Sequence, residues 1–442
     1  MTVAHLTQAP LTWIQEFDLD GLTDDQLQQA KRCLLDLIGV AAGATRTSLA
    51  DKAQRYVLSQ HGGDRPLLFA DGLASATGVA LHGAWLIDAL DAHDGQVLTK
   101  GHIGVSMLPG LLALPEIEEV SGRQFLGLLV LGYEVATRAG IALHGTASDY
   151  HTSGAWNTLG VVAVASRLLG LDQNQLHEAL GIAEYYGPRS QMMRCIDFPT
   201  MVKDGSGWGA MTGIGAALLA QDGFTGAPAV TVTGAEVQEV WRDLGQRWYL
   251  FEQYFKAYPV CRWAQPAVEA VLELRSDIGA GADIECIEIH TFHEAKCLAT
   301  HHPVTTEQAQ YSLPWPVACA LGVGTVDAAG VTSGLGDPVL QALSEKVSII
   351  ENEHYSALFP AQRWAHARIQ LKDGRWLESP PCEARGNPEN ALSYEQVVVK
   401  YHELADPVLG ARSRLLRDIV ETLEHRPISD LLMHLQGSGH HP

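Results

Sequence analysis

Two aspartates, two histidines and a lysine lie close together in residues 91–102 (DAHDGQVLTKGH). The stretch before them, residues 78–90, carries little charge and is apolar on nearly every face of a helix, which predicts a buried helix. Charge that begins where such a helix ends, followed by Gly95 and Gly101, indicates a loop that holds reactive groups. The simpler alternative is a solvated turn with a chance cluster of polar residues.

Four further segments carry polar residues among apolar or glycine-rich neighbours: 149–154, 187–194, 201–205 and 255–262. Taken singly, a histidine near a helix start is most often a cap, and a lysine beside a glycine is usually solvated. Taken together, the segments supply several cations in a chain whose formal net charge is −21. Such a set is suited to binding a di- or tricarboxylate, which the acidic surface would otherwise repel.

The composition excludes several classes of protein. The strongly negative charge argues against nucleic acid or an anionic membrane as a partner. The seven cysteines are scattered without a Cys-x-x-Cys pair, which argues against a disulfide framework or a zinc knuckle and fits a reducing cytoplasm. The first residues lack the features of a signal peptide, and the apolar runs are shorter than the roughly 20 residues that span a bilayer. We expect a soluble, cytoplasmic protein.

The elements that must position these residues divide the chain into two kinds of structure. Apolar residues at helical spacing dominate the chain to about residue 265, and many small residues favour close helix packing. Alternating apolar and polar residues predict strands at 283–292, 347–350 and 365–379, the last broken by a hairpin turn at 373–374. Between them, 308–323 and 338–343 read as helices, and helical pattern returns from residue 393, where Ser393 opens a capping box.

The expected fold is therefore mainly α, with a large all-helical domain and a smaller α+β lid domain. We place the helical domain at residues 1–265 plus 395–442 and the lid at 266–394. The C-terminal helices are expected to pack back on the helical domain.

The chain resembles the MmgE/PrpD family over nearly its whole length. The matching pieces are CLLDLIGVAAG from Cys33, LDAHD from Leu90, GYEV at 132–135, HTSG from His151, Lys203 before a glycine-rich helix, GFTG from Gly223, FKAYPVC from Phe255, AQYSLP from Ala309 and FP at 359–360 ahead of LKDG. Their order and spacing carry the resemblance, since each piece is weak alone. The resemblance implies a homodimer whose active site lies between the two domains and uses no metal or organic cofactor.

Members of this family act next to a carboxylate of a small polycarboxylic acid, and they include 2-methylcitrate dehydratase, cis-aconitate decarboxylase and iminodisuccinate epimerase. The resemblance implies these catalytic residues: Asp91, His102, His151, Lys203 and Lys256. The substrate-binding candidates are His93, Asp94, Lys100, Arg189, Arg194, Tyr258, Arg262 and Trp315. The chain departs from the family pattern after Asp91, at Trp315, where a tyrosine of the decarboxylase type is expected, and at Gln265, often a histidine.

The leading hypothesis is a cofactor-independent hydro-lyase similar to 2-methylcitrate dehydratase. Removing a proton next to a carboxylate builds negative charge on an anion, so the step needs cations nearby, and Lys203 and Lys256 supply them. A base that titrates near neutrality points to histidine. We assign His102 or His151 as the base, the other as the acid towards the leaving hydroxyl, and Asp91 as the group that orients them.

Other functions share these residues. An epimerase, isomerase or decarboxylase of a similar polycarboxylate begins from the same kind of carbanion. A metal-dependent hydrolase would use Asp91, His93, Asp94 and His102, but their spacing lacks the regularity of a helix- or strand-borne metal site. A non-catalytic binding protein is the remaining alternative, and the two retained lysines argue against it.

Overall fold

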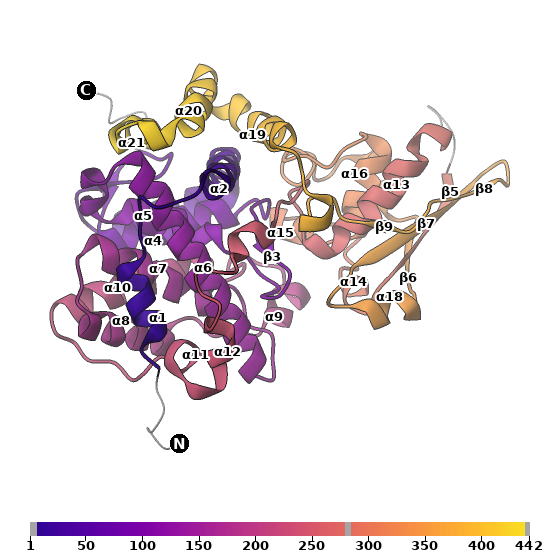
Figure 1. The fold of residues 1–442 in the computed structure, drawn as a ribbon. Helices are drawn as coiled ribbons and strands as arrows, with labels where there is room; N and C mark the ends of the chain where they lie inside the picture. Colours follow the sequence, from indigo (N-terminus) through magenta and orange to yellow (C-terminus); the bar gives the residue numbers. More distant parts are fainter. Residues whose placement is uncertain (1–6, 279–283, 438–442) are drawn as a thin grey trace.

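The computed structural model describes residues 7–278 and 284–437 and shows a large helical body beside a smaller part built around one sheet (Figure 1). The predicted mainly helical fold with a smaller α+β part is confirmed. The helices of the body, in chain order, are α1 (Ala9–Glu16), α2 (Asp24–Ala44), α3 (Ser48–Gln60), α4 (Ala76–Asp88), α5 (Gly104–Ala113), α6 (Gly122–Thr146), α7 (Gly154–Leu168), α8 (Gln173–Tyr186), α9 (Met192–Asp197), α10 (Ser206–Gln221), α11 (Val230–Thr233) and α12 (Gln238–Trp241).

Side-chain caps begin the long helices where the sequence predicts a start. Thr23, Ser121 and Asp172 each accept a hydrogen bond from the backbone of the residue three positions on, whose glutamine side chain accepts from the cap backbone in return. These capping boxes satisfy N–H groups that a helix cannot pair internally. The helices α2, α6 and α8 therefore start at fixed residues.

The centre of the body is a bundle in which α4, α5, α6, α7 and α10 pack against one another. Small residues are required here: a Cβ added to Gly213 would lie 2.6 Å from Cβ of Val161, and one added to Gly160 would lie 2.7 Å from Cβ of Ala136. Within the described residues, α6 is the helix whose length and composition would allow it to cross a membrane, but it is almost entirely buried in this bundle.

The sheet of the smaller part has the strand order β6-β5-β7-β8, with β9 paired to β7. Its strands are β5 (Ile284–Thr291), β6 (Val347–Glu351), β7 (Trp364–Leu371), β8 (Trp376–Glu378) and β9 (Cys382–Glu383). β5 and β6 run parallel, and the other pairs are antiparallel. Residues alternate between half-buried and buried along β7, and Gly374 turns the hairpin with φ of +89°. The predicted strands and turn are therefore confirmed from Ile284 onwards; Asp283 lies outside the described residues.

One predicted helix is wrong in a way that matters for the site. Residues 308–323 form two helices, α15 (Thr306–Gln310) and α16 (Pro314–Gly322), instead of one. Pro314 lacks the backbone N–H that would pair with the oxygen of Gln310 four residues earlier, and that oxygen accepts from the Cys261 N–H at 2.8 Å instead, so the first helix ends. The break leaves Tyr311 in an irregular segment. The remaining helices here are α13 (Gln265–Ile278), α14 (His293–Lys296), α17 (Pro338–Ser344) and α18 (Glu353–Leu358).

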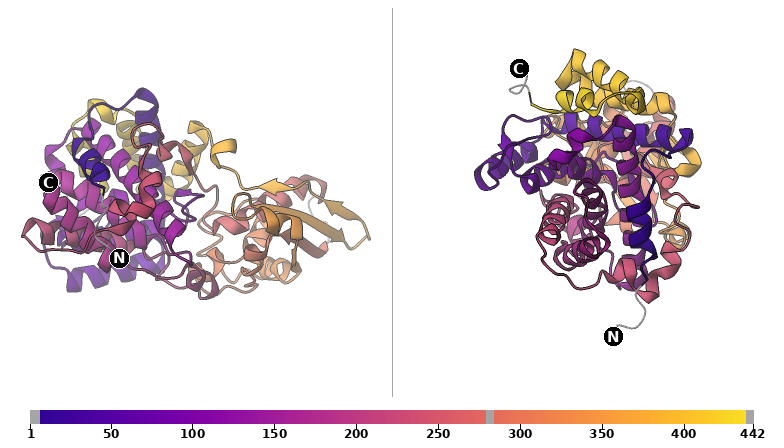
Figure 2. Two further views of the ribbon diagram at one scale, coloured as in Figure 1. Left: turned by 60° about the horizontal axis from the view of Figure 1, so that its bottom comes forward. Right: turned by 60° about the vertical axis from the view of Figure 1, so that its left-hand side comes forward.

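The C-terminal helices return to the body, where α19 (Tyr394–Leu409) lies against α2 and is followed by α20 (Ala411–Glu421) and α21 (Ile428–Leu435) (Figures 1 and 2). Lys400 of α19 joins the two ends of the chain, because its Nζ lies 2.5 Å from Oδ1 of Asp36 in α2. The domain boundaries at 265 and 395 remain a proposal.

Candidate active site

A small, partly open cavity lies where the segment after α4 meets segments of the sheet-containing part. Its free volume is about 20 Å³, on a measure by which one water molecule needs roughly 10–15 Å³. The residues that line it are Asp91, Lys100, His102, Met192, Ile196, Tyr254, Lys256, Cys261, Arg262, Trp263, Tyr311 and Arg363. Titratable groups that lie far apart in the sequence, from Asp91 to Arg363, therefore meet in one cavity.

The backbone is strained at this site. Asp91, Lys100 and Lys203 have φ of 51°, 52° and 48°, and Phe69 is the remaining non-glycine residue with positive φ in the part of the chain that the structure describes. A side chain in this left-handed region costs on the order of 1–3 kcal/mol, and such residues gather where function requires the geometry. Three of the four such residues lie at the predicted catalytic cluster.

Asp91 is held as a carboxylate by Lys256. The Lys256 Nζ lies 2.8 Å from Oδ1 of Asp91 and donates a hydrogen bond of 2.8 Å to its main-chain oxygen, and both side chains are buried. Burial acts to raise the pKa of Asp91, but Lys256, then Lys203 and His102, outweigh it and bring the pKa below its usual value. The pair is therefore ionic inside the protein.

His102 presents one ring nitrogen to the cavity in its unprotonated form. Its Nδ1 lies 2.6 Å from the main-chain oxygen of Asp94, which only a protonated nitrogen can satisfy, so Nε2 carries the lone pair. Burial, and then the nearby Lys256, lower the pKa of His102 to about 3. Nε2 lies 3.8 Å from Oδ1 of Asp91. His102 is thus neutral at pH 7 with the lone pair of Nε2 available, and it is a weaker base than the near-neutral histidine that the sequence led us to expect.

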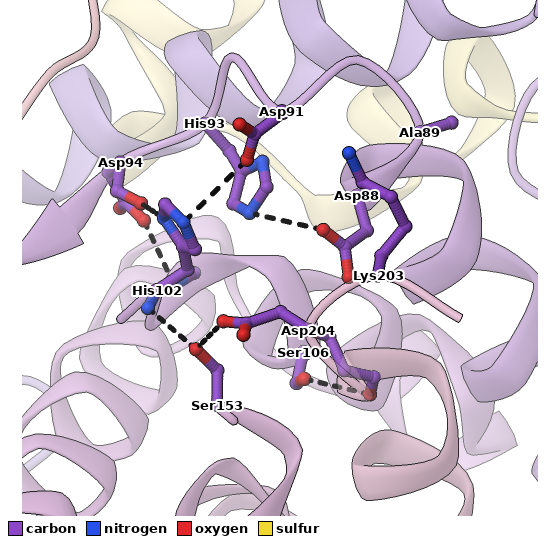
Figure 3. Close-up of polar contacts among 12 residues, drawn as sticks. Asp88, Ala89, Asp91, His93, Asp94, His102, Ser106, Ser153, Lys203 and Asp204 are labelled. Atoms are coloured by element: carbon purple, nitrogen blue, oxygen red, sulfur yellow. Dashed lines mark hydrogen bonds and ion pairs between the residues drawn. The ribbon is translucent and has the colours of Figure 1, made fainter. Parts of the chain in front are cut away.

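Hydrogen bonds to Asn157 of α7 and to Ser153, just before α7, fix the backbone of His102; Figure 3 shows the bond to Ser153. The His102 N–H donates to Oγ of Ser153 at 2.9 Å, and Ser153 in turn donates to Asp204. Nδ2 of Asn157 donates to the His102 oxygen at 2.8 Å. These bonds hold the imidazole in one position relative to Asp91.

Lys203 lies on the other side of Asp91, fully buried. Its Nζ donates to the side-chain oxygen of Gln310 and lies 4.9 Å from the centre of the Tyr311 ring. Nε2 of Gln310 donates to the main-chain oxygen of Ala89 at 2.9 Å, which ties the broken helix to the end of α4. Lys203 also favours ionisation of Asp88, whose pKa burial raises to about 7.

Two predicted substrate contacts lie behind the cavity. His93 is fully buried, its ring centre 4.3 Å from that of His102 and its Nε2 3.8 Å from Oδ1 of Asp88 (Figure 3). The Asp94 carboxylate accepts hydrogen bonds from the Tyr133 hydroxyl and from the Gly104 N–H, so it supports the loop. Neither side chain lines the cavity, and their predicted contact with substrate is not seen.

His151 is placed apart from the cluster of Asp91, Lys203 and Lys256. Its N–H donates to Nε2 of His144 at 3.1 Å, the two rings are stacked, and its Nδ1 lies 3.0 Å from the oxygen of Asp149. Within the described residues, no hydrogen bond or ion pair joins its side chain to the cluster. The structure therefore brings together four of the five predicted catalytic residues.

The other predicted substrate contacts also fall into residues that line the cavity and residues that do not. Lys100 lines the cavity, with its Nζ 3.6 Å from the centre of the Tyr150 ring. Arg189 and Arg194 are exposed side chains. The Trp315 indole is buried and donates to the oxygen of Gly330 at 2.9 Å, away from the cavity.

Arg262 and Tyr258 serve mainly to hold the chain in place. Arg262 lines the cavity, but its guanidinium donates to the side chains of Gln265 and Asn387 and to the oxygens of residues 384 and 385. The Tyr258 hydroxyl donates to Glu269 at 3.0 Å, outside the cavity. These contacts join the body to the segment after β9.

Among the residues that line the cavity and were not predicted, Tyr311 and Arg363 have polar side chains that bear on its chemistry. Tyr311 lines the cavity, whereas Trp315, where a tyrosine was expected, does not, and the Tyr311 motif, AQYSLP, was already visible as part of the resemblance. Burial raises the pKa of Tyr311 well above its usual value, so its hydroxyl stays protonated. Arg363, just before β7, had no motif that marked it.

The residues present do not form a metal centre. Across 7–278 and 284–437, no group of three or more His, Cys, Asp or Glu side chains is arranged to hold a metal ion. The four residues of the metal-hydrolase alternative have other partners. Asp91 pairs with Lys256, and Asp94 accepts a hydrogen bond from Tyr133. His93 lies near Asp88, and His102 Nδ1 bonds to the main-chain oxygen of Asp94.

Two family models match the chain, one described as the MmgE/PrpD N-terminal domain over residues 11–240 and one as the MmgE/PrpD C-terminal domain over residues 258–425. A cis-aconitate decarboxylase of Aspergillus terreus is 23% identical, and the match covers 95% of this chain and 94% of that protein. A cis-aconitate decarboxylase of Mus musculus is 24% identical over 96% of this chain and 90% of its own length. A cis-aconitate decarboxylase-like protein of Aspergillus oryzae is 26% identical over 51% and 49%.

Proposed function

The chain belongs to the MmgE/PrpD family, as its motifs indicated, and we propose that it is a cofactor-independent lyase acting on a small di- or tricarboxylate. Related proteins named cis-aconitate decarboxylase support an enzyme with lyase-like or decarboxylase-like activity at the level of the family. The observation that carries the proposal is the buried set of Asp91, Lys256 and Lys203 around the neutral imidazole of His102. An isolated buried cation is costly, and an anionic substrate with a carbanion next to it is the partner that such a set stabilises.

Each residue has a distinct part in the proposed reaction. The lysines Lys203 and Lys256 stabilise the negative charge that develops next to the substrate carboxylate. His102 accepts or returns the proton at that carbon through Nε2, and Asp91 stabilises the imidazolium that forms when it does. Tyr311, whose hydroxyl stays protonated, is the proton donor on the other side of the cavity. This assignment takes the second proton-transfer role away from His151.

Two reactions use this arrangement. In decarboxylation, the bond from carbon to the departing carboxylate breaks, CO2 leaves, and a proton is added to the carbon that receives the electron pair. In dehydration, His102 removes the α-proton, the bond to the β-hydroxyl breaks, and Tyr311 protonates the hydroxide as it leaves. The names of the relatives favour decarboxylation, while the pairing of a neutral acceptor with a protonated donor favours dehydration. Return of the proton to the opposite face would give an epimerase.

The setting of the enzyme is part of the proposal. We propose a cytoplasmic homodimer with no metal or organic cofactor and no nucleic acid or membrane partner. Tyr185, Tyr186 and Phe198, near α8 and α9, have 74%, 60% and 72% of their surface exposed, which supports a subunit interface on that face.

Product analysis in D2O tests the proposal. The purified protein is incubated with cis-aconitate, 2-methylcitrate and iminodisuccinate, and the products are followed by NMR. Release of CO2 with one deuterium added identifies a decarboxylase, a new alkene identifies a dehydratase, and exchange at Cα without either identifies an epimerase. Failure to release CO2, form an alkene or exchange deuterium with any small polycarboxylate would refute a lyase of this class.

A further inference from the structure

Arg363 stands out at the cavity because its guanidinium has no anionic partner. Its side chain is only 9% exposed, and its Nε is buried without a hydrogen-bond acceptor. In the described part of the chain, no carboxylate lies within ion-pair distance of its guanidinium. The guanidinium carbon lies 5.9 Å from the centre of the Phe359 ring, and the Glu383 carboxylate accepts a hydrogen bond from the Arg363 backbone N–H. A buried guanidinium without an anionic partner is destabilising.

Lys100 is the other uncommitted cation of the cavity. Its Nζ rests over the Tyr150 ring at 3.6 Å and makes no ion pair with any residue that the structure describes. Burial, and then repulsion from Arg363, lower the pKa of Lys100. Two like charges thus face each other across a partly buried space.

The other cations in and beside the cavity are already in use. Lys256 and Arg262 line it, and Lys203 lies behind it. Lys256 holds Asp91, Lys203 holds Gln310, and the guanidinium of Arg262 donates to four oxygens. Among the residues that line the cavity, Lys100 and Arg363 are therefore the cations left to bind a second carboxylate.

We propose that Lys100 and Arg363 form a second carboxylate subsite, which binds the non-reacting carboxylate of a dianionic or trianionic substrate. This inference rests on the proposed function, because it names the part of the substrate that the lysines next to His102 do not bind. Arg363 precedes β7 and Lys100 follows α4, so a bound carboxylate bridges the sheet-containing part and the body. A planar guanidinium suits two parallel bonds to one carboxylate. The enzyme would therefore select diacids over monoacids.

Binding of two probes that differ by one carboxylate tests this. Dissociation constants are measured by calorimetry for succinate and butyrate with the wild type, Arg363→Gln and Arg368→Gln. Arg368 is a matched control because it lies on β7, shortly after Arg363 in the chain, but pairs with Glu288 and Trp376 outside the cavity. We expect Arg363→Gln to weaken succinate binding 10- to 100-fold, the range for a charge-assisted pair of about 1.5–3 kcal/mol, and to change butyrate binding less than twofold. Arg368→Gln should leave both constants unchanged.

The inference is overturned if the wild type binds succinate no better than butyrate, or if Arg363→Gln keeps the wild-type preference. If Arg363→Gln unfolds, Lys100→Met is measured in its place and must show the same selective loss. Because the test measures binding, it separates the two proposals. Turnover of a diacid with an unchanged preference in the variants rejects the subsite alone, whereas a selective loss without any turnover rejects the lyase alone.

Discussion

Replacing Lys203 by methionine should reduce turnover by about two orders of magnitude while the protein remains folded. Methionine keeps most of the side-chain bulk and removes only the charge. The Lys203 Nζ lies 4.9 Å from the centre of the Tyr311 ring, and Tyr311 lines the cavity. We take about 5 Å as the distance between this charge and the reacting carbon. At about 5 Å and an effective dielectric constant of about 20, one charge pair contributes roughly 3.3 kcal/mol. That energy corresponds to about 250-fold in rate.

The same change has a smaller effect on stability. It leaves the buried oxygen of Gln310 without its donor, which costs about 1–3 kcal/mol, and it removes a buried ammonium whose desolvation opposed folding. Lys31 supplies the matched control: it is equally buried and bonded to Glu424 at 2.6 Å, but it lies outside the cavity. Lys31→Met should lower the melting temperature at least as much as Lys203→Met and leave kcat unchanged.

The assay is steady-state turnover of the substrate found by product analysis, together with thermal unfolding of both variants. Wild-type turnover in Lys203→Met would refute the charge-stabilisation argument. Equal losses of turnover in the two lysine variants would also refute it, because the effect would then come from stability.

Three further predictions follow from the buried charges. Lys256→Met should destabilise the protein by about 3–5 kcal/mol by leaving Asp91 uncompensated, and the double variant with Asp91→Asn should regain most of that in thermal unfolding; a double variant as unstable as the sum of the two singles would contradict the pairing. Asp88→Asn should gain stability relative to the wild type as pH rises from about 4 to 7. Burial raises the folded-state pKa of Asp88 from 3.8 to about 7, so its neutral carboxyl stabilises the wild type at low pH by roughly 4 kcal/mol, and the wild type loses that stabilisation as pH rises through the folded pKa. A pH-independent difference in melting temperature between the two proteins would contradict this. Lys400→Met should lower kcat with little change in KM, because Nζ donates to the oxygen of Ala92 at 2.6 Å and so positions Asp91; wild-type kcat would contradict this role.

Local signals in the sequence were sufficient to predict many of the helices and strands. Capping residues such as Ser121 and Ser393, the alternation along β7 and the turn at Gly374 act between near neighbours, so the chain reveals them directly. Lys203 and Lys256 were also recognisable, because each lies in a segment that resembles the MmgE/PrpD family, although a lysine beside a glycine is by itself usually solvated. The one wrong helix resulted from reading the pattern of 308–323 across Pro314.

The rest of the site depends on how distant segments meet. Arg363 resembles any arginine before a strand until the sheet-containing part is placed against the body. His93 and His102 are alike in the sequence, and only the folded structure shows that His102 lines the cavity and that His93 does not. Tyr311 reaches the cavity only because the helix breaks before Pro314. Tertiary packing determines which side chains reach the cavity, and residue types and their spacing in the sequence do not reveal it.

The most direct test of the central claim is solvent deuterium exchange at the substrate carbon by the wild type and by His102→Gln. The imidazole Nε2 is the one buried, unprotonated acceptor assigned to that carbon, and glutamine keeps a polar side chain of similar length without a base. We predict that the wild type incorporates deuterium from D2O and that His102→Gln loses incorporation by 100-fold or more, in line with removal of a general base, while a dicarboxylate still binds. Incorporation at the wild-type rate in a folded His102→Gln variant would contradict the account.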